Sequence, residues 1–340
     1  MKIFLSTLSV FITSFVFSQS DSTEIALTLN NKINGTSNVI YCSTVELLWR
    51  EMIEYLGEEP LPLISNPEII ELNKIAKELN SPIENEFWFA KVGLVENGII
   101  DTIKSAYKNQ FNIDWKPIEV KGADLLGLAY LQKNIEFFSR FYHDFRYFKF
   151  KDSIRVKSFG SEYGWTDPED KVQIKIHDYI NQNDFIVQIG SKDSLDEIYF
   201  AKIAPKSNLK ETYNEVIRRI NLPNCIEYLE EYDDLLIPYL SFDINNSFQQ
   251  FKHVELSSKK HPLLFSEELT QNIKFDLNQK GIQVQSTSIS TEIFGVDEVT
   301  VKPKYYAFDQ PFLIILKRKG EPNPYFLYWV ENAAHMQLLE

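Results

Sequence analysis

Apolar and polar residues along this chain follow several different periods between its two ends. Apolar residues at helical spacing predict helices over residues 22–34, 44–56, 67–79, 99–111 and 209–220. Alternating or continuous apolar patterns predict strands over 38–42, 86–96, 125–131, 148–156, 172–177, 184–189, 197–203, 235–244, 273–277, 311–316 and 325–330. No repeat or linker divides the chain, and strands and helices do not alternate strictly. The pattern predicts one α+β domain, with mixed helices early and large, mostly antiparallel sheets late.

The N-terminus has the pattern of a secretory signal peptide. Lys2 is followed by an apolar to weakly polar run over residues 3–17, and polar residues begin abruptly at Ser18. The run is shorter than the ~20 apolar residues of a membrane-spanning helix, and the small Ser18 suits cleavage by signal peptidase. A strand or helix of the domain itself is the alternative. We expect a signal peptide at 1–18, a mature domain at 19–340, and a secreted or periplasmic protein without stable membrane insertion.

Composition narrows the classes of partner. The chain has 340 residues, 44% hydrophobic and 14% aromatic, which is enough for a large core. Its formal net charge of −13 argues against binding to nucleic acid or to anionic membranes, because both require clustered Lys and Arg. Cys42 and Cys225 are too few for a disulfide framework, and their pairing stays open, as does the oligomeric state.

Residues 306–316, Tyr-Ala-Phe-Asp-Gln-Pro-Phe-Leu-Ile-Ile-Leu, resemble the C-terminal signature of the serpin family. Phe308, Asp309, Pro311 and Phe312 stand at its most specific positions. Alone, the segment is equally consistent with an ordinary buried strand entered through a turn. Segments that resemble further serpin elements occur in the family's order, at 25–43, 86–98, 126–133, 196–220, 236–248 and 273–281. The chain is therefore similar to a divergent, bacterial-type serpin.

The resemblance implies a reactive-centre loop, at about residues 281–300, that a protease cleaves and that then inserts as a strand into the central sheet. The loop begins at a glycine, and inward side chains then alternate with outward ones. The hinge residues are Gly281, Ile282, Gln283, Val284, Gln285 and Ser286. The scissile region would be Ile293, Phe294, Gly295 and Val296, and the large Phe294 implies a secreted chymotrypsin-like protease as the partner. An ordinary solvated connection is the alternative interpretation of that region.

Several positions depart from the serpin pattern. Ile282 is bulky, and Gln285 stands where a small residue is usual. Lys91 and Gly127 replace the asparagines of the region where the sheet opens, and Cys-Ser-Thr-Val at 42–45 replaces a serine-rich helix start. The chain between residues 111 and 125 is also too short for the helix that covers the central sheet, so we expect that helix to be absent. These departures favour the alternative function, a non-inhibitory binding or structural protein.

No catalytic constellation stands out, and we expect neither an enzyme nor a cofactor. The five histidines, at positions 143, 177, 253, 261 and 335, show no metal-ligand spacing. The serine in Gly-Ser-Glu-Tyr-Gly at 160–164 is misplaced for a nucleophile elbow, and we expect a hairpin loop there. The acidic stretch 227–234 lacks the pattern of a calcium loop. Asn34-Gly35-Thr36 forms a glycosylation sequon.

Overall fold

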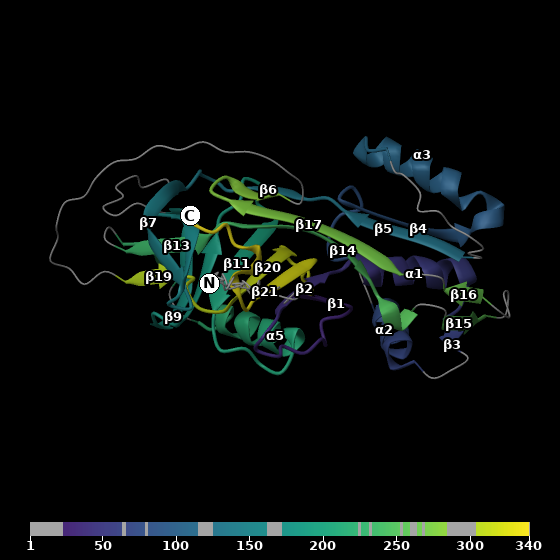
Figure 1. The fold of residues 1–340 in the computed structure, drawn as a ribbon, viewed down its shortest axis with the longest axis horizontal. Helices are drawn as coiled ribbons and strands as arrows, with labels where there is room; N and C mark the ends of the chain where they lie inside the picture. Colours follow the sequence, from purple (N-terminus) through teal and green to yellow (C-terminus); the bar gives the residue numbers. More distant parts are fainter. Residues whose placement is uncertain are drawn as a thin grey trace, which may run out of the picture.

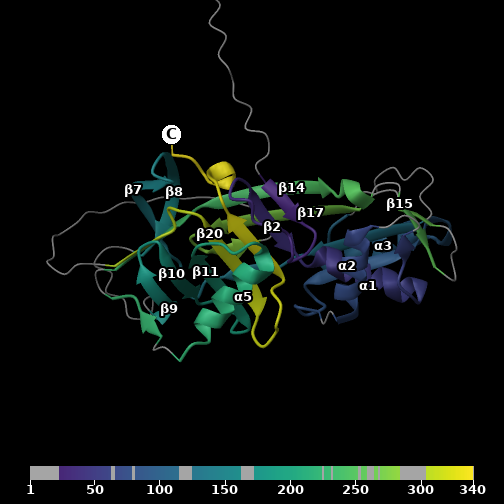
Figure 2. The same cartoon turned by 90° about the horizontal axis from the view of Figure 1, so that it is seen from below.

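The computed structural model describes residues 23–62, 66–78, 81–114, 125–161, 172–223, 226–230, 233–251, 254–258, 264–266, 269–283 and 304–339. Its helices are α1 (Thr44–Leu56), α2 (Pro67–Glu78), α3 (Ile99–Phe111) and α5 (Leu209–Ile220), with short 3₁₀ helices η1 (Val95–Asn97), η2 (Gln249–Phe251) and η3 (Ala333–His335). Figures 1 and 2 show α1, α2 and α3 together at one end of the molecule and α5 toward the other. None of the described helices is long and apolar enough to cross a membrane.

The largest sheet has eight strands and joins both ends of the chain. In spatial order these strands are β1 (Thr23–Ala26), β2 (Asn38–Cys42), β21 (Phe326–Val330), β20 (Phe312–Arg318), β11 (Asp196–Lys202), β10 (Asp184–Ile189), β9 (Ile174–Asn181) and β12 (Glu227–Tyr228). All neighbours are antiparallel except β1 and β2.

Both faces of this sheet are covered, which explains why its central strands are apolar throughout. Leu313 and Ile315 of β20 point to one face and pack in a cluster with Leu209 and Val216 of α5. The alternate residues of β20 point to the other face and belong to the main core. A strand buried on both sides reads as a continuous apolar run, as the sequence of β20 does.

Four smaller sheets complete the fold. One contains β19 (Tyr305–Ala307), β13 (Asp234–Pro238), β8 (Ile154–Gly160) and β7 (Tyr142–Phe150). A second contains β14 (Leu240–Ser247), β17 (Thr270–Asn278), β18 (Gly281–Gln283) and β6 (Asn134–Glu136). A third contains β16 (Leu264–Ser266), β15 (Val254–Ser257) and β3 (Leu61–Pro62). The fourth pairs β4 (Trp88–Leu94) with β5 (Leu125–Leu131). In Figure 1, β14 and β17 run from the large sheet toward the end that carries α1.

The predicted α+β class with mostly antiparallel sheets is confirmed. The helices expected at 44–56, 67–79, 99–111 and 209–220 are α1, α2, α3 and α5. Strong local signals set these boundaries: α1 ends at Gly57, which has a φ of 74° and donates to the carbonyls of the last turn. At the start of α5, the Asn208 side chain accepts from the Glu211 amide.

The helix predicted at 22–34 is wrong, because this segment forms β1 followed by turns. Polar side chains there bond to the backbone, as they do in turns: Asn31 accepts from the Thr28 amide at 3.2 Å, and Asn34 accepts from the Thr36 amide at 2.9 Å. Asn and Thr that satisfy the local backbone in this way compete with helix formation. Parallel pairing with β2 supplies backbone bonds to Thr23–Ala26, and residues 29–33 bond to the main chain around the start of α5.

Two predicted strands are each divided. The one at 148–156 is a hairpin of β7 and β8, whose turn contains Lys151 and Asp152 at positive φ. The one at 235–244 divides after Pro238 into β13 and β14, which belong to different sheets. The hairpin loop predicted at 160–164 is wrong at its first residue, because Gly160 belongs to β8 and pairs with Leu236 of β13; residues 162–164 lie outside the described part of the chain. A Cβ there would lie 1.6 Å from the Leu235 carbonyl oxygen, so the glycine permits close strand contact.

Some predictions fall outside the described residues. These include the signal peptide at 1–18, which lies in the segment 1–22, and any pairing of Cys42 with Cys225. Cys42 is buried, and its sulfur accepts from the Thr44 hydroxyl at 3.5 Å. The three described residues after α3, 112–114, are not helical, and the rest of the link to β5 lies outside the described part, so the expected absence of a covering helix stays a prediction.

A buried carboxyl at the start of α1 makes stability depend on pH. Glu46 is 3% exposed and accepts a bond of 2.9 Å from the Tyr41 hydroxyl. Burial raises the pKa of Glu46 to about 7; Tyr41 and Lys210 oppose the shift, and Glu71 adds to it. The folded-state pKa lies above the ordinary 4.5. Between pH 4.5 and about 7, the folded chain therefore keeps a proton that the unfolded chain has released. The resulting stabilisation is complete below pH 4.5 and is lost as the pH rises to about 7.

Replacing Glu46 by Gln keeps an acceptor for Tyr41 and removes the titration. We expect the variant to match the parent near pH 4.5 and to exceed its free energy of unfolding by about 3 kcal/mol near pH 8. Urea unfolding at the two pH values measures the difference, with the exposed Glu54→Gln on the same helix as control. A difference that does not change with pH would show that this carboxyl is not the titrating group.

Candidate functional site

The end of β17 turns back on itself, and the next residues form β18 between β17 and β6. Ile282 at the centre of β18 lies opposite Leu277 of β17 on one side and Ile135 of β6 on the other. Both pairings are antiparallel. β18 begins at Gly281, so the first three residues of the predicted hinge form a short strand held along both edges.

Gly281 occupies a backbone conformation and a space that suit no other residue. Its φ is 155°, and a Cβ added to it would lie 2.0 Å from the Ile135 carbonyl oxygen and 3.0 Å from the Glu136 Cα. These are backbone atoms of β6 and cannot rotate away. Glycine is therefore required wherever β18 and β6 lie this close together.

Ile282 anchors the strand in the core. Its side chain is fully buried and belongs to the same cluster as Leu277 and Ile135. Burying an isoleucine side chain contributes about 2–3 kcal/mol, which is large for a strand of three residues. The bulk that departs from the serpin pattern thus fills a place in the core.

The turn between β17 and β18 is attached to the segment that follows β6. The Asn278 side chain accepts from the Lys280 amide at 2.9 Å, which closes the turn. The Phe137 amide donates to the Lys280 carbonyl at 2.9 Å, and the Phe141 amide donates to the Gln279 carbonyl at 2.9 Å. Main-chain bonds therefore fix the point where the chain reverses.

Beyond β18, two strand edges have no strand between them in the described part of the chain. β17 pairs with β18 only through Asp276, Leu277 and Asn278, and it also approaches β5. β5 pairs with β4 along its other edge. A strand that continued the path of β18 would lie between β17 and β5 and would have to separate them.

Gln271 connects β17 to the start of α1. Its amide nitrogen donates to the Cys42 carbonyl at 3.2 Å and to the Thr44 hydroxyl, and its side chain is buried. The sequence analysis did not identify this residue. A signal was available, because Gln271 is the polar member of an alternating inward set with Ile273, Phe275 and Leu277.

Two departures from the serpin pattern have plain structural consequences. Lys91 is half-exposed and lies 3.7 Å from the Glu51 carboxylate on α1. A Cβ on Gly127 would approach Leu48 of α1 to 3.1 Å. Lys91 thus contributes a surface ion pair between β4 and α1, and Gly127 allows β5 to approach Leu48 of α1 closely.

The signature residues hold β19 against the large sheet, to which β20 belongs. Phe308 and Phe312 are fully buried with ring centroids 5.0 Å apart, and Phe308 also packs on Phe185 and Phe200. The Asp309 carboxylate accepts from the Lys202 ammonium group, which is buried and also donates to the Ala307 carbonyl at 2.9 Å. Burial lowers the pKa of Lys202, and Asp309 opposes that shift. Pro311, partly buried, precedes β20 and ends the turn.

Comparison with known proteins gives a result at the level of fold. No family model and no curated protein matches the chain. Among solved structures, Serpin48 of the insect Tenebrio molitor is 11% identical, with 85% of this chain and 96% of that chain covered and a TM-score of 0.47. Uncleaved ovalbumin is 12% identical, with 87% and 93% covered and a TM-score of 0.48. Human thyroxine-binding globulin complexed with thyroxine is 13% identical, with 87% and 92% covered and a TM-score of 0.46.

The chain is similar in fold to serpins. At these identities and TM-scores the likeness does not extend to activity, so the function proposed below for this serpin-like chain rests on its own geometry.

The other predicted site residues of the serpin-like loop lie outside the described part of the chain. These are the remaining hinge residues Val284, Gln285 and Ser286 and the scissile region Ile293, Phe294, Gly295 and Val296. The backbone of Gln283 is described and pairs with Asp276 and Asn134. The structure therefore brings together the first three hinge residues with β6 and β17.

Within the described residues, no group of three or more His, Cys, Asp and Glu is arranged to hold a metal ion. His177 bonds to the Gln188 side chain at 2.8 Å, and burial lowers its pKa. His335 bonds to the Thr23 hydroxyl at 2.7 Å. In the acidic stretch 227–234, the Asp233 carboxylate accepts from the Lys304 amide at 2.8 Å. This bond fixes the start of β19.

Proposed function

We propose that this protein is a secreted, serpin-like protease inhibitor whose reactive-centre loop starts at Gly281. The observation that carries the proposal is β18. The residues that lead into the loop form a strand between β17 and β6, antiparallel to both. A loop whose first residues already lie in the sheet can extend that strand by pairing further residues as β17 and β5 separate.

The energetic basis of the proposed mechanism is the pair of open edges next to β18. Before cleavage, the loop is tied at both ends, to β18 and to β19. Cutting within it frees the segment after Gln283 to follow the path of β18 between β17 and β5. Each inserted residue would exchange hydrogen bonds to water for bonds to strands, and every second side chain would be buried.

Export and target complete the proposal. The signal peptide at 1–18 would deliver the chain to the periplasm or the medium, where secreted proteases act. A chymotrypsin-like enzyme is the proposed partner, because Phe294 is the large side chain within the scissile region 293–296. This function needs no catalytic group or cofactor of the inhibitor's own.

A non-inhibitory binding or structural role is the second candidate, and two observations favour it. The full burial of Ile282 fixes β18 in place, and the buried bonds of Gln271 tie β17 to α1. Both contacts oppose movement of β17 away from β5. If the free energy of these contacts exceeds the free energy gained by insertion, the loop is cleaved without trapping the protease.

Reaction of the chain 19–340 with chymotrypsin tests the proposal. We expect the protease to lose activity as inhibitor is added and a denaturant-resistant adduct to form, with the chain cut after Phe294. Phe294→Gly is expected to abolish both, whereas Phe138→Gly, which removes an exposed phenylalanine elsewhere, should leave them unchanged. Cleavage after Phe294 with the protease still active would support the second candidate instead.

A further inference from the structure

β6, the strand that holds the outer edge of β18, has three residues and depends on the link between β10 and β11 for its position. This link comprises residues 190–195. At the last residue of β6, the Glu136 carbonyl accepts from the Lys192 amide at 3.0 Å. Two residues later, the Phe138 amide donates to the Gly190 carbonyl at 2.9 Å. The C-terminal end of β6 is thus bonded to the main chain of the large sheet's link.

The N-terminal end of β6 is attached to the same link through a buried lysine. Lys133 lies between β5 and β6, and its side chain is 3% exposed. Its ammonium nitrogen lies 3.1 Å from Asp193 Oδ2 and 3.2 Å from Asp196 Oδ2. It also lies 4.0 Å from the centroid of the Phe87 ring. A buried lysine with two carboxylates and an aromatic face has little freedom to move.

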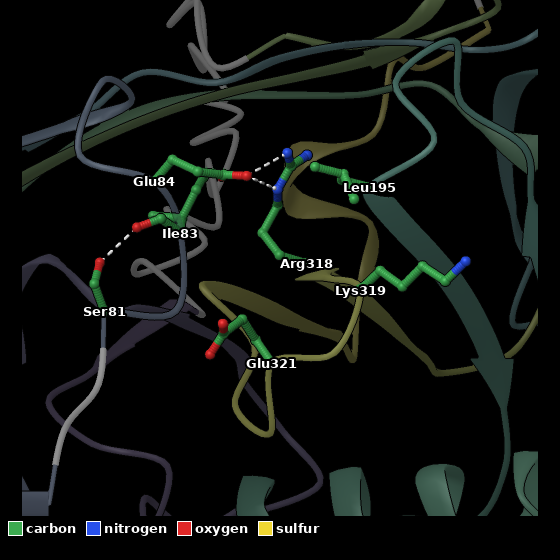
Figure 3. A pocket seen from close by; sticks show the side chains of 7 residues that line it. All are labelled: Ser81, Ile83, Glu84, Leu195, Arg318, Lys319 and Glu321. Carbon is green, nitrogen blue, oxygen red and sulfur yellow. Dashed lines mark hydrogen bonds and ion pairs between the residues drawn. The ribbon is translucent and has the colours of Figure 1, made fainter.

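The two carboxylates are themselves fixed by a second cation. Arg318, the last residue of β20, donates to Asp193 at 2.8 Å and to Asp196, and its other nitrogens donate to Glu84 at 3.1 and 2.6 Å. Figure 3 shows Glu84 and Arg318 facing each other beside a cavity of about 180 Å³. Glu84 is partly exposed. The cluster of these five side chains therefore joins four segments of the chain that are far apart in sequence.

The cluster sets two cations against three carboxylates, so removing one cation would leave a buried carboxylate with a single charged partner. Burial raises the pKa of Asp193, but the bonds from Arg318 and Lys133 outweigh it and hold that pKa well below its usual range. For Asp196, burial raises the pKa, and the two cations offset the shift only in part. Loss of Lys133 alone would thus leave Asp196, which is almost fully buried, paired with Arg318 only.

We propose that Lys133 is a positioning residue that fixes β6 against the β10–β11 link and so holds the place in which β18 pairs. Its effect on β18 concerns the intact chain. Its consequence for loop insertion rests on the function proposed above.

Hydrogen exchange of the uncleaved protein tests the proposal. In Lys133→Met, we expect exchange at Gly281–Gln283 and Asn134–Glu136 to rise about tenfold, with protection of β10 and β11 unchanged. Lys133→Arg should restore much of the protection because it keeps the charge. Lys192→Met is the matched control, since its side chain pairs with Glu136 at 2.6 Å on the same link but is 61% exposed. We expect it to exchange like the parent.

Two results would overturn the proposal. One is normal protection of β18 in a folded Lys133→Met, and the other is an increase spread evenly over the large sheet, which indicates general destabilisation. If Lys133→Met does not fold, Asp193→Asn decides, because it weakens the same contact and keeps the size and shape of the side chain. A folded Asp193→Asn with unchanged exchange at β18 also excludes the positioning role. No protease enters these measurements, so they stand apart from the test of inhibition.

Discussion

Cutting the chain once within residues 284–300 is expected to raise its melting temperature by about 20 °C or more. If about ten residues insert between β17 and β5, they gain a ladder on each side, and a net value of about 1 kcal/mol per residue gives roughly 10 kcal/mol. For a domain of this size, 1 kcal/mol corresponds to about 2 °C. Scanning calorimetry of the intact and the nicked protein measures the shift.

Paired arginine variants separate insertion from other effects of nicking. Side chains alternate along a strand, so the buried Ile282 predicts that Val284 would point inward and Gln285 outward after insertion. Val284→Arg is expected to abolish most of the shift, because its charge would enter the core, and Gln285→Arg is expected to retain it. Equal melting of intact and nicked parent protein would show that the fold stores no strain that cleavage releases, and it would favour the binding role.

The sequence predicted those helices and strands whose stabilising contacts follow from their own residues. The boundaries of α1 followed from its apolar spacing and from Gly57, and those of β20 and β21 from apolar runs that two covering layers require. The segment 22–34 had helical spacing too, but its Thr and Asn side chains bond to the backbone, and pairing with β2 decides its structure. Periodicity alone does not distinguish these cases, because the competing contacts come from residues elsewhere in the chain.

The site was predictable only where one segment carries the signal. Gly281 could be placed from the motif that surrounds it, whereas its pairing with β6 could not, because this register depends on how β6 is held. Lys133 looked like an ordinary charged residue after an apolar run. Its two carboxylates lie in the β10–β11 link and at the start of β11, and the guanidinium that orients them comes from the end of β20. Such a cluster becomes visible only when several segments have been brought together.

Replacing Gly281 by Ala is expected to displace β18 from the sheet. The added Cβ would meet the Ile135 carbonyl oxygen at 2.0 Å, so the strand and β6 must separate. Separation exposes Ile282 and breaks the short ladders on both sides, which together cost about 4 kcal/mol in free energy of unfolding. Urea unfolding measures this loss, and hydrogen exchange at Gly281–Gln283 should rise in parallel.

Gly98→Ala is the matched control, because it introduces strain without a clash. Gly98 has a φ of 78°, and nothing lies within 4 Å of where its Cβ would be. An alanine there costs about 1–2 kcal/mol, the ordinary cost of a left-handed conformation. If the two variants lose the same free energy and β18 keeps its protection, close contact between Gly281 and β6 is not what holds the strand. The larger loss at Gly281, confined to β18 and β6, would instead locate the start of the loop within the sheet of the intact protein, as the proposed insertion requires.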